Sequence, residues 1–490
     1  MQKKLSKILD FLESLKGFCF VLATILLFNI FLYFNSIHNQ DYFSQQRRED
    51  ATGFEMVYAK KFAYFYYYTG DFPLATLNDQ IKYSKNDAER EIKENGQDLI
   101  MEYKHWSRLG ENARIWAFAP NAFLSGSPES YQIRLFNSIV FVLALFLLYY
   151  GFWRLNKVSV GILLITLINL TPYFIFETYI NENIFALFGS VFFMVLGLNV
   201  NSLFEEEKKS TFLLLTGISA ALIGFFSEFR NEISIVFVSL ILICVFAKNQ
   251  RLILKISSLA ICFLIFYGTK SGIRNYFDHK FQETTKLVND SGGHAYTGKR
   301  ISGHNIWHPI YCGLGDFDEK YGYEWNDKVP YRYAIPILKE KYGLDVNYSN
   351  KYYLDNYYDE DSLFYMKFDE IKQYETVVKD KVISQIKNDP SWYSLIILKR
   401  IAKTLSNTIP IPLLGWLIFC VVYFLYRYRY WSYLKLIFIS LPLSASSILI
   451  YSGKGATFNS VFVYFVILGI VVLLNNKRAL LSHFSKNFQI

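Results

Sequence analysis

The chain alternates long apolar runs with polar segments over its 490 residues. A helix of about 20 apolar residues crosses the roughly 30 Å hydrocarbon core of a bilayer, and runs of about this length recur along the sequence. The pattern predicts ten membrane-spanning helices. The ten runs are residues 17–35, 134–153, 158–176, 181–200, 211–227, 232–247, 255–270, 411–426, 434–451 and 459–475.

Composition agrees with this pattern. The chain is 52% hydrophobic and contains 45 Phe and 38 Tyr, a balance that a soluble domain rarely carries. We therefore expect an α-helical polytopic membrane protein.

The distribution of charge predicts the topology. The first apolar run lacks a small-residue cleavage site, so we expect a retained helix rather than a signal peptide. If the N-terminus is cytoplasmic, the short cytoplasmic segments carry 17 basic and 5 acidic residues, as the positive-inside rule requires. Both termini are then cytoplasmic. The net charge of +9 is a topology signal, and we expect no nucleic-acid partner.

Two polar segments are too long to be simple connections. Residues 36–133 form the first outer loop, in which the aromatic-rich stretch 53–68 predicts an interfacial helix. Residues 271–410 predict a mostly helical extracytoplasmic domain followed by an interfacial helix. The resulting modules are 1–270 with seven spans, 271–410, and 411–490 with three spans and a short tail.

Ionisable residues gather in the outer turns, where they are costly unless they are paired or used. A carboxylate can serve as a general base, and a cation can bind a phosphate leaving group. The alternative for the turn around Arg230 is a structural salt bridge within the turn. The candidate residues are Asp41, Asp50, Glu182, Glu228, Arg230 and Lys454.

A second cluster lies in the polar domain and combines Gly, aromatic, His and Asp residues. His304, Trp307, His308 and Asp316 are candidates for contact with an acceptor, because aromatic faces stack on sugar rings. Metal binding by the two histidines is a weaker alternative, since Pro309 disfavours helical geometry at His308. Structural packing is the third alternative. We predict no metal site.

Three stretches resemble the membrane-embedded glycosyltransferases of the GT-C superfamily, such as the dolichyl-phosphate-mannose mannosyltransferases. They are "EDATGFEMVYAKKFAYFYYYTGDF", "NARIWAFAPNAFLSGSPESYQIRLF" and "GISAALIGFFSEFRNEISIVF". The resemblance covers roughly residues 15–270. It implies a GT-C-like fold and a polyprenyl-phosphate sugar donor.

The resemblance also implies roles for individual residues. Asp50 would be the catalytic acid residue, with Asp41 second, and Arg230 and Lys454 would bind the lipid phosphate, with Glu228 and Glu182 at the donor site. The family's paired acidic residues are missing beside Asp50, so a divalent metal is compatible with the chemistry but not indicated. No other cofactor is expected.

The resulting expectation is an enzyme of the bacterial inner membrane with its active site on the extracytoplasmic side. It would transfer one sugar to a glycan, lipid or protein acceptor of the envelope. An O-antigen polymerase or ligase is the first alternative, because such proteins also combine many spans with a large outer loop. A lipid-linked glycan transporter is the second, although the spans are almost free of charged residues and the two halves show no repeat.

Overall fold

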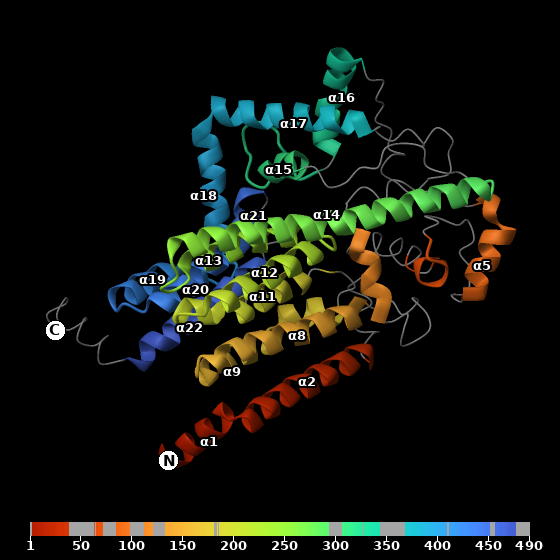
Figure 1. The fold of residues 1–490 in the computed structure, drawn as a ribbon. Coiled ribbons are helices and arrows are strands. Elements are labelled where there is room, and N and C mark those ends of the chain that lie inside the picture. Colours follow the sequence, from red (N-terminus) through yellow and green to blue (C-terminus); the bar gives the residue numbers. More distant parts are fainter. Residues whose placement is uncertain are drawn as a thin grey trace.

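The computed structural model describes most of the chain as helices (Figure 1). No strand occurs within the described residues, so the prediction of an all-helical fold is confirmed, and its long apolar helices are compatible with a helical membrane protein. The described residues are 2–38, 63, 65–71, 85–98, 112–120, 133–180, 184, 186–293, 306–326, 328–343, 368–408, 411–450 and 456–476.

The N-terminal part forms a helical bundle that ends in one very long helix. Its helices are α1 (Gln2–Glu13), α2 (Leu15–His38), α8 (Ile133–Arg154), α9 (Val158–Leu170), α10 (Pro172–Ile175), η3 (Phe176–Ile180), α11 (Ala186–Phe204), α12 (Lys209–Phe226), η4 (Asn231–Ile235), α13 (Val236–Phe246) and α14 (Leu252–Asp290). The predicted first outer loop contributes α5 (Lys85–Glu94), η1 (Gly96–Asp98) and η2 (Asn112–Phe118).

The remaining helices belong to the polar domain and the C-terminal module. The first group is α15 (Trp307–Leu314), α16 (Lys328–Tyr342), α17 (Phe368–Asn388) and α18 (Pro390–Ser406). The second is η7 (Leu414–Leu417), α19 (Ile418–Arg427), α20 (Trp431–Ser440), η8 (Leu441–Ser444), α21 (Ala445–Leu449) and α22 (Ala456–Asn475).

Most described residues of the ten apolar runs lie on helices, but these helices differ in length. Within the described residues, five helices are long and apolar enough to cross a membrane, and a sixth span results if α9 and the following helix count as one bent pair. That pair bends by 63° at Thr171, where Pro172 removes a backbone donor. The other four apolar helices have 10–17 residues. The total of ten spans therefore stays a prediction.

The bundle is held by close backbone contact between α8 and α11. A Cβ atom placed on Gly197 would lie 2.4 Å from the backbone carbon of Leu147, and one on Gly151 would lie 2.3 Å from the carbonyl oxygen of Gly197. Small residues allow such contact between membrane helices, where packing replaces the hydrophobic effect. These two glycines set the distance between the helices.

The helix α14 passes through the predicted module boundary at residue 270 without a break. Its C-terminal part extends beyond the bundle toward α5 (Figure 1), and Ser291 at its end lies against Gly96. The segment after residue 270 is therefore a rod that continues a membrane helix.

The helices α15–α18 enclose a second hydrophobic core, which includes Tyr311, Tyr323, Val378 and Trp392. In Figure 1, α15–α17 lie together on one side of the bundle, and α18 leads back to it. The buried Arg400 on α18 donates to the carbonyl oxygens of Gly313 and Ile448 at 2.5 and 3.1 Å. This guanidinium thus ties the polar domain to the C-terminal module.

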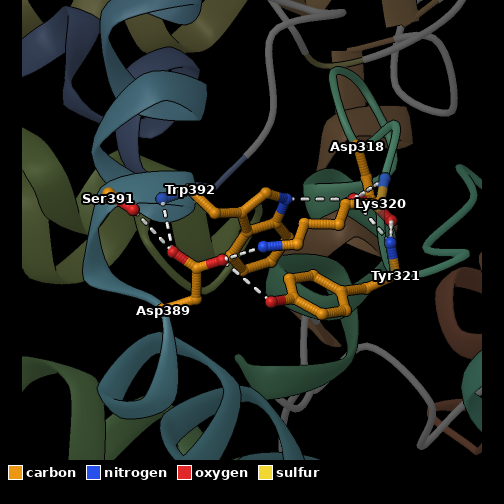
Figure 2. Close-up of polar contacts among 6 residues, drawn as sticks. All are labelled: Asp318, Lys320, Tyr321, Asp389, Ser391 and Trp392. Atoms are coloured by element: carbon orange, nitrogen blue, oxygen red, sulfur yellow. Dashed lines mark hydrogen bonds and ion pairs between the residues drawn. The ribbon is translucent and has the colours of Figure 1, made fainter.

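Two carboxylates brace the same domain (Figure 2). Asp389 caps α18 by accepting from the backbone N–H of Trp392 at 3.0 Å, and it also accepts from Lys320 at 2.6 Å and Tyr321 at 2.8 Å. Asp318 accepts from the indole N–H of Trp392 at 3.0 Å. The hydrogen bonds from Lys320, Ser391, Trp392 and Tyr321 hold the pKa of Asp389 well below its usual range. Asp318 and Asp389 therefore have structural roles in this domain.

Candidate functional site

The turn between α12 and η4 contains a carboxylate that is completely buried. Glu228 is 0% exposed, and its Oε1 accepts from Nε of Arg274 at 2.9 Å, with Nζ of Lys270 at 3.6 Å. Its Oε2 is buried and has no hydrogen-bond partner. Burial raises the pKa of Glu228, while Arg274 and Lys270 oppose that effect. Two cations thus face one carboxylate.

Two further guanidinium groups lie at the same turn. Arg230 pairs with Glu232, and the buried Arg114 of η2 donates to the carbonyl oxygen of Phe229 at 3.1 Å. We use the name cationic turn for Arg114, Glu228, Arg230, Glu232, Lys270 and Arg274. Its basic side chains outnumber its carboxylates, so the group favours an anion.

Aromatic rings form a wall beside the cationic turn. The indole of Trp116 stacks on Phe225 at 5.8 Å between ring centroids and lies 5.0 Å from Phe277. Its N–H donates to the hydroxyl of Tyr66 at 3.2 Å, and that hydroxyl is 2.7 Å from the hydroxyl of Tyr276. The described pieces of the first predicted loop therefore pack directly against α12 and α14.

Asp71 follows these rings on the same loop. It belongs to the "TGD" stretch and is half-buried at the end of the helical residues 65–69. Burial raises the pKa of Asp71; nearby Lys280 lowers it and Glu283 raises it further. Residues 274 and 280 of α14 are about 9 Å apart along the helix axis. Asp71 thus places a carboxyl group of the first loop near the stretch of α14 that also carries Lys270 and Arg274.

No family model, curated protein or solved structure matches the chain. The GT-C resemblance therefore stays a prediction that depends on the motifs. No group of three or more His, Cys, Asp or Glu side chains within the described part of the chain is arranged to hold a metal ion.

Several predicted site residues lie outside the described residues. Asp41, Asp50, Glu182, Lys454 and His304 belong to this group, so the structure gives no position for them. Of the predicted donor residues, Glu228 and Arg230 are described and lie in one turn. They have different partners: Arg230 pairs within the turn, as the structural alternative predicted, whereas Glu228 pairs across to α14.

The predicted acceptor residues that are described lie in the second core. His308 is buried on α15, with its Nδ1 2.5 Å from the hydroxyl of Tyr374. Asp316 lies 3.8 Å from Nε of Arg400, and the backbone N–H of Trp307 donates to Glu375 at 3.4 Å. These contacts join α15 to α17 and α18. They have the form expected of structural packing, and acceptor contact by this cluster stays a prediction.

Sequence reasoning overlooked the α14 cations. Lys270 ends the apolar run 255–270 and Arg274 follows four residues later, so a continuing helix would place both on one face. That spacing was a usable signal. Arg114 and Trp116 had none, because Phe229, which accepts from Arg114, and Phe225, on which Trp116 stacks, lie more than 100 residues away.

Proposed function

We propose that this protein is a glycosyltransferase that moves a sugar from a polyprenyl-phosphate donor to an envelope glycan, lipid or protein. The observation that supports this proposal is the cationic turn, in which Lys270 and Arg274 flank the buried Glu228 at the end of membrane helices. A phosphate at this depth would find charged donors on the turn, at Arg230, and on α14, at Lys270 and Arg274. The aromatic wall around Trp116 offers faces on which a sugar or an isoprenoid chain can pack.

The proposed reaction breaks the bond between the anomeric carbon and the phosphate oxygen and forms a bond between that carbon and the acceptor oxygen. The acceptor proton goes to a carboxylate, and the lipid phosphate leaves with the bonding electrons. Arg230 would stabilise the charge on the departing phosphate. Asp50 is the proposed base, and Asp71 is the described alternative on the same loop.

Binding of the lipid phosphate part of the donor is tested by native mass spectrometry of the purified full-length protein with undecaprenyl phosphate. Arg230→Gln removes one charge-assisted hydrogen bond, which is worth about tenfold to a hundredfold in affinity. Arg332→Gln, an exposed arginine on α16, is the matched control and should bind like the wild type. Equal binding by both variants would count against the donor site.

The reaction itself is tested by mass spectrometry of envelope glycans from a deletion strain. One sugar should be missing, and the wild-type gene should restore it. Asp50→Asn and Asp71→Asn, expressed separately, then identify the base. An unchanged glycan profile in the deletion strain would refute the transferase. If the protein is instead a polymerase or ligase, the deletion strain should make shorter or unattached glycan chains in which every sugar is present.

A further inference from the structure

A cavity of about 900 Å³ opens at the opposite end of the bundle from the cationic turn. Its walls come from the turn after α8, the start of α9, the end of α11, the turn after α13, the α19–α20 turn with the first residues of α20, and the end of α22. These segments were predicted to lie on the same side of the membrane, and in the structure they meet at one place. We call this end of the bundle the basic end.

The charge of this cavity has one sign. Lys157, Lys248, Arg429 and Lys435 line it, and no acidic residue is among the described lining residues. Glu207, a buried acid of the neighbouring turn, is already paired with Arg154 at 3.2 Å. Four like charges repel one another, and an anion in the cavity would relieve that repulsion.

Two of these lysines have a structural task as well. Nζ of Lys435 donates to the carbonyl oxygen of Phe246, and Nζ of Lys248 donates to that of Phe204, at the C-terminal ends of α13 and α11. An ammonium group has three donors, so each keeps two for a ligand. Lys157 lies 5.3 Å from the centroid of the Phe204 ring, and Arg429 is exposed at the mouth. Helix capping alone therefore does not account for all four cations.

The other walls of the cavity distinguish a lipid from a soluble anion. Val160 and Leu163 of α9 face it together with Leu468 and Val472 of α22, so apolar side chains continue inward from the charged mouth. Trp431 and its neighbouring tyrosines line the rim, at the position that aromatic residues take at a membrane interface. A head group at the mouth and an acyl chain along α9 and α22 would match both parts.

We propose that this basic cavity binds the phosphodiester head group of an anionic membrane lipid, with its acyl chain against α9 and α22. The proposal does not depend on the proposed function, because it concerns the other end of the bundle and different residues. A lipid bound there would bridge the first helices of the chain to the last, through α9 and α22.

Native mass spectrometry of the full-length protein with phosphatidylglycerol, and with phosphatidylcholine for comparison, tests this site. The double variant Lys157→Gln/Arg429→Gln should weaken phosphatidylglycerol binding about tenfold or more and leave the weaker phosphatidylcholine binding unchanged. Lys208→Gln/Arg251→Gln removes the same charge from exposed residues at the same end that do not line the cavity. This control should bind phosphatidylglycerol like the wild type.

A second variant tests the apolar wall without changing charge. Val160→Phe should narrow the chain path and weaken phosphatidylglycerol binding several-fold, with thermal stability as the folding control. Equal binding by the wild type and the Lys157/Arg429 variant would overturn the proposal, as would an equal loss in the control pair. Displacement of the lipid by millimolar inorganic phosphate would overturn the lipid assignment, because the mouth alone would then account for binding.

Discussion

The buried carboxylate of the cationic turn allows a sharp test of the structure. Glu228→Gln keeps the shape of the side chain and one oxygen acceptor for Arg274, but it removes the negative charge. Lys270 and Arg274 are then left facing each other across a neutral group. In the wild type, Oε1 of Glu228 lies 2.9 Å from Nε of Arg274 and 3.6 Å from Nζ of Lys270, and the substitution removes the ionic part of both contacts.

The size of the effect follows from burial. Removing one partner of a buried ion pair typically costs about 3–5 kcal/mol. The retained acceptor offsets part of this, and so does the lower cost of burying a neutral amide instead of a carboxylate, so we expect a loss of about 2–3 kcal/mol. Glu232→Gln is the matched control. Its pair with Arg230 is 37% exposed at the carboxylate, so it should cost less than about 1 kcal/mol.

Thermal unfolding in detergent, followed with a thiol-reactive dye, measures the difference. Cys244 on α13 and Cys262 on α14 are buried and react only when the bundle opens, whereas the exposed Cys19 and Cys420 react at every temperature and set the baseline. Glu228→Gln should lower the midpoint by several degrees. Adding Lys270→Met should recover part of that loss, because it removes the excess charge. Equal midpoints for Glu228→Gln and Glu232→Gln, or no recovery in the double variant, would refute this account.

Two further predictions concern packing and pH. Gly197→Ala should destabilise the bundle by about 1–3 kcal/mol, because the new methyl group would meet the backbone of α8. Gly268→Ala is the control and should not destabilise it, because a Cβ there has no atom within 4 Å. Equal unfolding midpoints for the two variants would contradict the close contact. Burial raises the pKa of Glu375 from 4.5 to about 7, so the native fold favours its neutral form and loses that stability as pH rises through 7. The free energy of unfolding of Glu375→Gln should therefore equal that of the wild type near pH 4 and exceed it by about 1 kcal/mol at pH 8, after allowing for the partial exposure of Glu375. A pH series of unfolding midpoints measures this difference. Glu340→Gln, at an exposed position, should show no such pH-dependent gain.

Hydropathy predicted where the chain enters apolar surroundings but not where helices end. The run 255–270 was expected to stop as a span, yet α14 continues to Asp290. Residues 271–290 contain no proline, and pairs such as Lys280 and Glu283 support a solvated helix. Conversely, the run 158–176 was expected to be one span and bends by 63° at Pro172. The length of an apolar run depends on its hydrophobic residues, whereas the length of a helix also depends on prolines and on polar residues beyond the run.

The candidate site could be predicted only in part, for a related reason. The turn 227–232 was recognisable because its charges interrupt two apolar runs. The partner of Glu228 was not, because Arg274 follows it by 46 residues and no local spacing connects them. His308 shows the same limit, since its contact with Tyr374 on another helix favours packing among the three alternatives that the sequence left open.

The two charged regions of the bundle use the same residue types to different ends, and their partners explain the difference. At the cationic turn, carboxylates neutralise part of the positive charge, so the fold of the turn depends on ion pairs within the protein. At the basic end, Lys157 and Arg429 line a cavity without a carboxylate among its described lining residues, and their charge is left to a ligand. Removing Arg274, which pairs with the buried Glu228, should therefore lower stability at the first region, whereas removing Lys157 and Arg429 should lower lipid affinity at the second. The position of the acids, rather than the number of basic residues, decides which effect follows.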